Sequence, residues 1–262
     1  MVRERRRLLI RPERLRDAPS VDGHPQLPLT AEESHYVSRV LRLKHGQELA
    51  IVNGRGQLWG GCVGAGDGRQ RSVSLLQPLQ APEAEAPSPA PSLTLAIALP
   101  KRDSELLLRM ACELGVDQLQ PLIADHSVRA ERFTRPRLEA ILREATEQCE
   151  RLWLPQLADP CPSRDWFAAP APGAKLLATT RRGPLPDPLT ALRSQAGAAE
   201  GLQLAIGPEG GWSSSEEELA SACGWLAVGL NAAILRTSTA AVAGLSLLSH
   251  WREREWSNPA RG

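Results

Sequence analysis

Two segments combine residue types and spacings that suit binding of a small charged ligand. The first, Leu204–Trp212, reads LAIGPEGGW. Its three glycines, Gly207, Gly210 and Gly211, allow backbone conformations and close approaches that a side chain would forbid. Between a strand and a capped helix, such a turn presents backbone N–H groups to a nucleotide-sized ligand. Many α/β loops look similar, and the segment lacks both the P-loop and the GxGxxG dinucleotide pattern.

The second segment, Val228–Ala240, reads VGLNAAILRTSTA. Arg236 follows two apolar residues and precedes the threonine-rich start of a predicted helix, which Thr237 or Thr239 could cap. An arginine here either fixes the loop or meets an anion. The residue types alone leave both interpretations open.

The elements that must position these segments alternate between strands and helices. Strands are predicted at Leu93–Leu99, Asp117–Ile123, Lys175–Thr180, Leu202–Ile206 and Leu226–Leu230. Helices are predicted from Asp103 to Leu114, from Thr134 to about Trp153, at Leu189–Gln195, from a capping box at Ser213–Glu216 to Cys223, and at Thr237–Trp251. Repeated β–α units predict a mainly parallel sheet covered by helices, with ligands at the carboxyl ends of its strands.

The first part of the chain is predicted to be mostly β. Its strands are expected at Leu8–Ile10, Glu48–Val52, Gln57–Val63 and Ser72–Leu79, with one helix from a capping box at Thr30–Glu33 to about Leu41. These elements suggest a small barrel. Residues 81–92, APEAEAPSPAPS, read as a stiff linker. The expected domains are therefore residues 1–80 and 93–262.

Charge is distributed unevenly along a nearly neutral chain. Residues 1–80 carry 13 Lys and Arg against 8 Asp and Glu, whereas the remainder is slightly acidic. The excess is mostly arginine, which pairs with phosphate oxygens in a bidentate manner. A predicted helix face carrying His35, Arg39 and Arg42 adds to it. This basic part suits an RNA or DNA partner, and a solvated arginine-rich face is an equal alternative.

Composition narrows the class of protein. With 42% apolar and 23% charged residues, the chain is expected to form a packed core. No apolar run is long enough for a membrane span, and the basic N-terminus lacks the pattern of a secretory signal. Five scattered cysteines form no CxxC and suit a reducing cytoplasm. The five histidines have no metal-ligand spacing, so no metal is expected.

An ordered series of motifs resembles a known family over nearly the whole chain. The series comprises RRLLI (6–10), HYVSRVLRLKHG (35–46), NGRG (53–56), ALPK (98–101), ACELGV (111–116), EATEQ (144–148), IGPEGGW (206–212) and ILRTSTA (234–240). Taken together, these resemble the SPOUT-superfamily methyltransferases of the RsmE type. Members of this family methylate N3 of uridine in 16S ribosomal RNA.

The resemblance implies a fold, a cofactor and partners. The fold would be α/β, with a small PUA-like β-barrel domain followed by a SPOUT domain that ends in a trefoil knot. S-adenosylmethionine would bind in the knot. A homodimer packed through knot-region helices is implied, as is 16S rRNA, in the small ribosomal subunit, as substrate.

The resemblance also assigns roles to residues. The cofactor-binding residues would be Ile206, Gly207, Pro208, Glu209, Gly210, Gly211, Leu230, Ile234, Leu235, Thr237 and Thr239. The RNA-binding residues would be Arg5, Arg6, Arg7, Arg39, Arg42, Lys44 and Lys101. Arg236 is the candidate for stabilising negative charge on the base or for binding a phosphate. Glu209 either accepts a proton or orients the loop.

Several positions depart from the family pattern. Asn231, Ala232 and Ala233 replace Gly-Pro-Arg, and Ser238 replaces a carboxylate. Arg102 stands where Gly is usual, and His126 stands where Arg usually precedes Ser. Two alternatives therefore stay open beside an active methyltransferase of this type. One is an RNA-binding protein that has lost activity, and the other is a methyltransferase that modifies a different RNA nucleotide.

Overall fold

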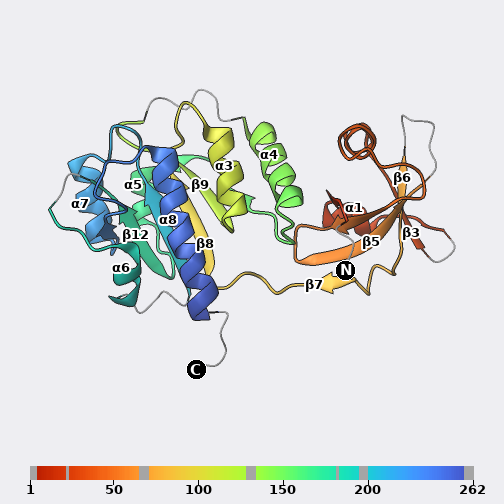
Figure 1. Ribbon diagram of the computed structural model, residues 1–262. Helices are drawn as coiled ribbons and strands as arrows, with labels where there is room; N and C mark the ends of the chain where they lie inside the picture. Colours follow the sequence, from red (N-terminus) through yellow and green to blue (C-terminus); the bar gives the residue numbers. More distant parts are fainter. Residues whose placement is uncertain are drawn as a thin grey trace. The chain divides into compact units, whose positions relative to one another are not determined.

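The computed structural model describes residues 5–21, 24–64, 71–127, 134–180, 183–194 and 200–256 (Figure 1). The chain divides into two compact units. The first contains residues 1–88 and 143–154, and the second contains residues 89–142 and 155–262. The division falls inside helix α4 (Arg135–Gln148). Residues 143–154 thus group with the first unit, although the sequence analysis placed them in the second domain.

The first unit is built on one mixed sheet. Its described strands are β1 (Arg7–Leu9), β2 (Ser20–Val21), β3 (His24–Pro28), β4 (Glu48–Val52), β5 (Gln57–Val63), β6 (Ser72–Leu75) and β7 (Ala84–Glu85). The strand order is β1-β4-β5-β6-β3-β2, and β7 pairs with β5. The β1–β4 pairing is parallel and the other pairings are antiparallel. The helical elements are α1 (Pro12–Arg16), α2 (Ala31–His35) and the π-helical turn η1 (Tyr36–Val40).

Local chemistry explains two features of this unit. The β4–β5 hairpin turns at Asn53, whose side-chain oxygen accepts hydrogen bonds from the backbone N–H groups of Arg55 and Gln57, at 2.8 and 3.1 Å. Gly54 and Gly56 complete the turn with φ of +68° and +94°. Helix α2 begins at the predicted capping box, in which the Thr30 hydroxyl accepts from the N–H of Glu33.

The second unit is built on a parallel sheet. Its strands are β8 (Ser92–Ile97), β9 (Gln118–Ile123), β10 (Gln156–Leu157), β11 (Cys161–Pro162), β12 (Ala174–Ala178), β13 (Gly201–Ile206) and β14 (Leu226–Val228). The order is β10-β9-β8-β13-β12-β14, with β11 beside β9, and every pairing is parallel. All six residues of β13 are buried, as expected of a central strand covered on both faces.

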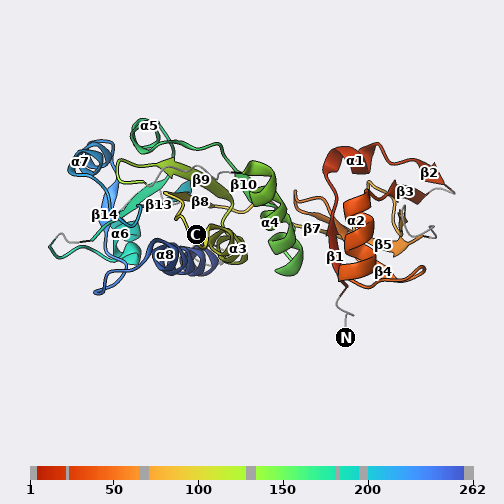
Figure 2. The ribbon, with the colours of Figure 1, turned by 90° about the horizontal axis from the view of Figure 1, so that it is seen from above.

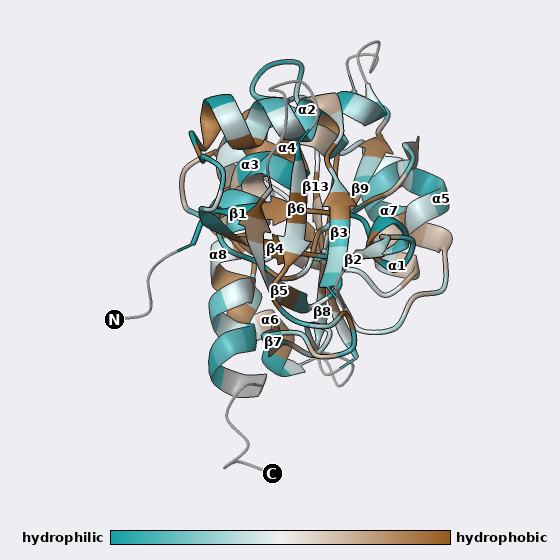
Figure 3. Ribbon diagram, turned by 90° about the vertical axis from the view of Figure 1, so that its right-hand side faces the viewer, coloured by the Kyte–Doolittle hydropathy of each residue, from teal (hydrophilic) through white to brown (hydrophobic). Residues whose placement is uncertain are grey.

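Helices cover both faces of this sheet (Figure 2). Helices α3 (Ser104–Glu113), α6 (Pro188–Ser194) and α8 (Thr237–Trp251) lie on one face, where α8 packs against the other two helices and against β8 and β13. Helices α5 (Ser163–Ala168) and α7 (Ser214–Ala222) pack together on the other face. A second π-helical turn, η3 (Arg252–Trp256), follows α8. Figure 3 shows hydrophobic residues concentrated in strands such as β4 and β13, whereas α7 is largely hydrophilic.

The structure corrects several expected element ends. Helix α4 stops at Gln148 rather than near Trp153, and Glu150 has a left-handed φ of +61°, which a continuing helix does not allow. Strand β6 ends at Leu75 rather than Leu79, before Pro78, which has no N–H to donate to a ladder. Asp103 occupies the N-cap of α3 with φ +64°, and its side chain makes no capping hydrogen bond.

Candidate active site

A pocket opens at the carboxyl ends of three adjacent strands of the second unit. It has a volume of about 330 Å³. Its walls come from the residues that follow β12, β13 and β14, and from the start of α8. They include Ala178, Thr179, Thr180, Ile206, Gly207, Pro208, Glu209, Gly210, Gly211, Trp212, Leu230, Asn231, Ala233, Ile234, Leu235, Thr237 and Ala240. The position agrees with the strand-end location expected from the β–α alternation.

The structure brings together nearly all residues that the sequence assigned to a cofactor. Ten of the eleven line this pocket, and the exception is Thr239, whose side chain is exposed on the first turn of α8. The expected capping role of Thr237 and Thr239 is wrong, because the N-cap is Arg236 and no side chain caps the helix. Instead, the buried Thr237 hydroxyl donates to the carbonyl oxygen of Gly207 at 3.2 Å. This bond joins the two segments that the sequence analysis singled out.

Residues 207–212, here called the glycine turn, leave little room for added side chains. A Cβ atom on Gly207 would lie 3.0 Å from the ring of Trp212. A Cβ atom on Gly210 would lie 2.9 Å from the Cβ of His126. Gly211 has φ +75°, a conformation that favours glycine, and its N–H donates to the Pro208 carbonyl oxygen at 2.8 Å. Glycine is therefore required here for space and for backbone conformation.

Trp212 anchors the end of the glycine turn. Its indole N–H donates to the carbonyl oxygen of Ala178, at the end of β12, with a distance of 3.0 Å. Its ring meets the fully buried Phe167 edge-on, with the ring centroids 5.2 Å apart. Phe167 makes a similar contact with Trp225 at 5.3 Å. This aromatic packing fixes one wall of the pocket against α5.

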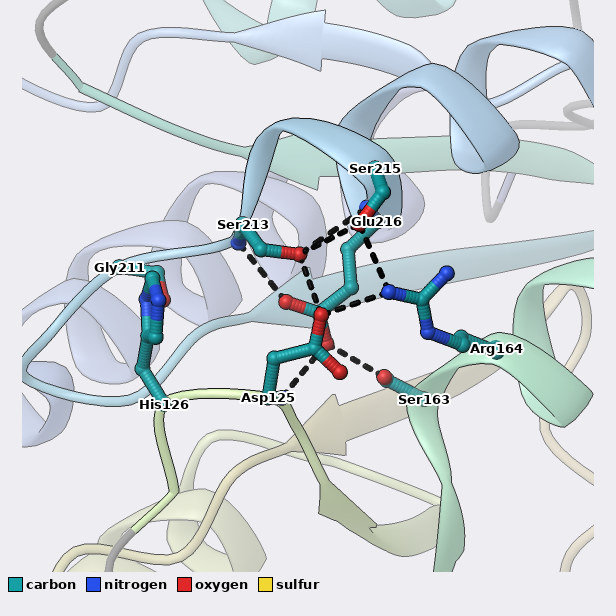
Figure 4. A network of polar contacts seen from close by, with 8 residues as sticks. All are labelled: Asp125, His126, Ser163, Arg164, Gly211, Ser213, Ser215 and Glu216. Atoms are coloured by element: carbon teal, nitrogen blue, oxygen red, sulfur yellow. Dashed lines mark hydrogen bonds and ion pairs between the residues drawn. The ribbon is translucent and has the colours of Figure 1, made fainter.

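A polar network holds the same turn from the side of β9 (Figure 4). At its centre is the carboxylate of Glu216, which is fully buried. One Glu216 oxygen accepts from the Ser163 hydroxyl at 2.5 Å and from the N–H of Asp125 at 3.1 Å. The other accepts from the N–H of Ser213 at 2.8 Å, which completes the capping box of α7. A buried charge is tolerated only with such partners.

Asp125 forms the outer part of this network. Its carboxylate accepts from the Arg164 guanidinium at 2.6 Å and from the Ser213 hydroxyl at 2.5 Å. These two hydrogen bonds, the one from Arg164 foremost, lower the pKa of Asp125 below its usual range. Beside it, Nδ1 of His126 lies 3.1 Å from the carbonyl oxygen of Gly211. Sequence reasoning identified the Ser213–Glu216 capping box but missed Asp125, Ser163 and Arg164, which lie far away along the chain.

The two candidate catalytic residues lie differently. Glu209 lines the pocket and its side chain is exposed. Arg236 is exposed and lies outside the pocket wall, between Leu235 and Thr237, which both line it. Sequence reasoning also missed Thr179 and Thr180. Both were placed inside the predicted strand Lys175–Thr180, whereas β12 ends at Ala178 and the two threonines follow it at the carboxyl end of the sheet.

The expected RNA-binding residues fall into two groups. Arg5 forms an ion pair with Glu83, and Arg7 pairs with Glu150 at 3.0 Å, so both arginines hold parts of the first unit together. The others, which are Arg6, Arg39, Arg42, Lys44 and Lys101, are exposed. His35, Arg39 and Arg42 were expected on one face of a helix that ends near Leu41. All three side chains are exposed, but α2 ends at His35, Arg39 lies in the π-helical turn η1, and Arg42 follows that turn with φ +55°, so the expected α-helical face is wrong.

Neither a metal site nor a membrane-spanning helix is found among the described residues. No group of three or more His, Cys, Asp or Glu side chains there is arranged to hold a metal ion. None of the helices described is both long and apolar enough to cross a membrane.

Comparison with protein families and curated proteins gives consistent matches. A family model for an RNA methyltransferase domain matches residues 86–249, and one for an RNA methyltransferase PUA domain matches residues 29–71. Ribosomal RNA small subunit methyltransferase E of Synechocystis is 34% identical over 248 residues, covering 93% of this chain and 77% of that protein. The protein of the same name from Rickettsia conorii is 30% identical, covering 81% of this chain and 84% of that protein.

Solved structures share the fold of the whole chain. A methyltransferase of Legionella pneumophila, in complex with the cofactor S-adenosylmethionine, is 26% identical with a TM-score of 0.76, covering 94% of this chain and 98% of that one. Ribosomal RNA small subunit methyltransferase E of Neisseria gonorrhoeae has a TM-score of 0.77 at 21% identity, with the same coverage. The fold is therefore a PUA-like domain with an α/β methyltransferase domain.

Proposed function

The chain belongs to the family of RNA methyltransferases that these relatives represent, and on that premise we propose that it methylates N3 of a uracil in 16S ribosomal RNA, using S-adenosylmethionine as donor. The observation that carries the proposal is the pocket at the ends of β12, β13 and β14. Its walls contain the glycine turn and the Leu230–Thr237 segment, the two features that the sequence singled out.

The pocket fits the adenosyl part of the donor. Its volume of about 330 Å³ lies in the range of small-molecule sites. Gly207 and Gly210 let the glycine turn pack closely against Trp212 and His126, where an added side chain would displace the turn that lines the pocket. Leu230, Ile234 and Leu235 supply an apolar wall. The donor, when bound, supplies a methyl group that its sulfonium charge already activates.

The protein's task is to align the base and to stabilise its charge. Uracil N3 becomes nucleophilic when it loses its proton, so negative charge develops on the base. The Arg236 guanidinium, next to two pocket residues, is our candidate for stabilising that charge on the base carbonyl oxygens. Glu209, on the pocket wall, either accepts the proton or orients the turn. The base must leave its stack to reach this position.

The first unit supplies the RNA contacts in this proposal. Arg6, Arg39, Arg42 and Lys44 are exposed there and would contact phosphates. Lys101, in the loop after β8 of the second unit, would add a contact. Arg5 and Arg7 would contribute less, since each is engaged by a carboxylate of the protein.

We further propose a homodimer, a trefoil knot in the second unit, and a cytoplasmic location. The dimer would pack through α8, and light scattering at two protein concentrations would test it. The family to which the chain belongs supports a knot at the pocket, where Thr237 of the last helix bonds to Gly207 of the glycine turn. The five scattered cysteines, which form no CxxC motif, and a ribosomal substrate support the location.

Calorimetric titration with S-adenosylmethionine, followed by mapping of the methylated nucleotide, tests the proposal. We expect one donor bound per chain and a single N3-methylated uridine in 16S rRNA or in the small subunit. Gly210→Val should abolish binding, because its Cβ would lie 2.9 Å from the Cβ of His126. Gly183→Val is the matched control, since no atom lies within 4 Å of a Cβ there.

Three outcomes would contradict the proposal. A wild-type protein that binds no donor at millimolar concentration would exclude donor-dependent methylation. Donor binding without RNA methylation would favour the RNA-binding alternative. Methylation of another atom would keep the enzyme class and overturn the uracil assignment.

A further inference from the structure

The loop that follows β9, residues 124–127, is closed by two internal hydrogen bonds and contacts the glycine turn. The Ala124 N–H donates to the Ser127 hydroxyl at 2.9 Å, and the Ser127 N–H donates to the Ala124 carbonyl oxygen, also at 2.9 Å. These two bonds close the loop on itself. Asp125 and His126 lie between these two bonds, with Asp125 facing Ser213 and Arg164 and His126 beside Gly211 (Figure 4).

Asp125 connects three elements that are distant in sequence. Its carboxylate accepts hydrogen bonds from the Ser213 hydroxyl, at the N-cap of α7, and from the Arg164 guanidinium of α5. Its backbone N–H reaches the buried Glu216 of α7 at 3.1 Å. Arg164 also donates to the Ser215 hydroxyl at 2.7 Å, so the same cation bridges the β9 loop and the first turn of α7.

Ser213 follows the glycine turn directly, so its position sets where the turn ends. Its hydroxyl both donates to Asp125 and accepts from the Glu216 N–H at 3.2 Å. Two residues before Ser213, the carbonyl oxygen of Gly211 lies 3.1 Å from Nδ1 of His126. A carbonyl oxygen only accepts, so this ring nitrogen is the donor. The β9 loop thus contacts the chain at Gly211 and at Ser213, on either side of Trp212.

We propose that Asp125 is a positioning residue for methyl transfer, which holds the glycine turn in its donor-binding conformation through Ser213. This inference rests on the proposed function, in which the glycine turn binds S-adenosylmethionine. Without the Asp125 carboxylate, Ser213 loses its bond to the β9 loop and keeps only the Ser215 hydroxyl, 3.2 Å away, as a possible acceptor, while Arg164 loses its ion pair with Asp125. The turn then samples conformations in which its backbone groups no longer match the donor, and donor affinity falls.

The test compares Asp125→Ala, Asp125→Asn and a control, Glu105→Gln. Glu105 forms an exposed two-bond pair with Arg137 in the same unit, away from the pocket. We expect Asp125→Ala to raise both the donor Kd and the donor KM at least tenfold, with kcat at saturation within threefold of wild type. Asp125→Asn keeps one oxygen acceptor and should recover most of the affinity. Glu105→Gln should change neither constant by more than twofold.

Hydrogen exchange of the donor-free protein separates this inference from the proposed function. In Asp125→Ala, the backbone amides of residues 209–213 should exchange at least tenfold faster, while the amides of β13 stay as slow as in wild type. Unchanged exchange at the turn, or an unchanged donor Kd in Asp125→Ala, would overturn the inference. Equally faster exchange in β13 would also overturn it, because the residue would then act on overall stability. A wild-type protein that binds no donor would defeat the proposed function, and the exchange result would still decide whether Asp125 holds the turn.

Discussion

At the scale of single residues, Arg236 is the position where a substitution should change the reaction rate without changing the stability of the protein. Its side chain is exposed and makes no capping hydrogen bond, although the residue occupies the N-cap of α8. Removing it should change the free energy of unfolding by no more than about 0.5 kcal/mol. Removing a group that stabilises developing charge typically costs about 10² to 10³ in rate.

We therefore expect Arg236→Ala to lower the single-turnover rate at saturating donor and RNA about a hundredfold, with the melting temperature unchanged. The rate of methyl incorporation into 16S rRNA is the measurement. Arg193→Ala, which removes an exposed arginine from the last turn of α6, is the control. Turnover at the wild-type rate in Arg236→Ala would remove Arg236 from the mechanism.

The pocket residues also show which signals a sequence carries. Gly207, Gly210 and Gly211 were found because close packing at the first two and a left-handed φ at the third all require glycine, which is visible in the sequence. Thr179 and Thr180 were missed because the predicted strand included them, whereas β12 ends at Ala178 and leaves both on the pocket wall. Asp125 was missed for a different reason, since its role depends on partners about 40 and 90 positions away, at Arg164 and Ser213.

At the scale of elements, local signals were reliable where one short segment determines the outcome. Both capping boxes, at Thr30 and at Ser213, begin the helices expected of them. Asp103 occupies the N-cap of α3, but its side chain makes no capping hydrogen bond. Its left-handed φ of +64° differs from the extended conformation that a capping residue usually has. Helix α4 ends early, at Gln148, and Glu150 just beyond it is left-handed, a conformation that a glutamate in the sequence does not predict.

The last turns of α4 place a buried carboxyl group in the first unit. The Glu147 side chain is 6% exposed and accepts from the Leu9 N–H of β1 at 2.7 Å. Burial raises the pKa of Glu147 to about 7, although the hydrogen bonds from Leu9 and from the Tyr36 hydroxyl and the nearby Arg143 oppose this rise. Glu144 adds a smaller effect in the same direction as burial. The folded protein therefore holds this proton more tightly than the unfolded chain does.

This difference makes the first unit less stable as the pH rises. The contribution of Glu147 is fully present below about pH 4.5 and is lost as the pH approaches about 7, since the unfolded chain releases the proton first. The loss is on the order of 3 kcal/mol. Glu147→Gln keeps an oxygen acceptor and does not titrate. We expect the variant to be more stable than wild type at pH 8 and to lose that advantage at pH 4.5, as urea unfolding at both pH values would show. An advantage that does not depend on pH would contradict the assignment.

At the scale of the whole molecule, the sequence predicted the class of each sheet but not its order. Buried apolar runs alternating with helices predicted the parallel sheet of the second unit. Nothing local indicates that β13 lies between β8 and β12, or that residues 143–154 group with the first unit. Both depend on packing between segments far apart in the chain. The motif series succeeded because family resemblance carries that long-range information.

The C-terminal end of α8 is fixed by a nearly buried ion pair in the second unit. Arg252 pairs with Asp117 at 2.5 Å, with each side chain only 12% exposed, and it also donates to the Gly115 carbonyl oxygen at 2.8 Å. The same Asp117 oxygen accepts from the Leu93 N–H at 2.9 Å, at the start of β8. Arg252 thus connects the C-terminal end of α8 to the starts of β8 and β9. The other end of that helix forms a wall of the pocket.

Arg252→Ala leaves the Asp117 carboxylate largely buried without its cation. Breaking a buried pair in this way costs about 3 to 5 kcal/mol, whereas an exposed pair contributes about 0 to 1 kcal/mol. We therefore expect a large loss of stability in the second unit, measured by urea unfolding, and a smaller one in the control Arg137→Ala, which breaks the exposed pair with Glu105. Because α8 also begins at the pocket, donor present in excess should restore part of the stability lost in Arg252→Ala. Equal losses in the two variants would mean that Arg252 does not anchor the helix.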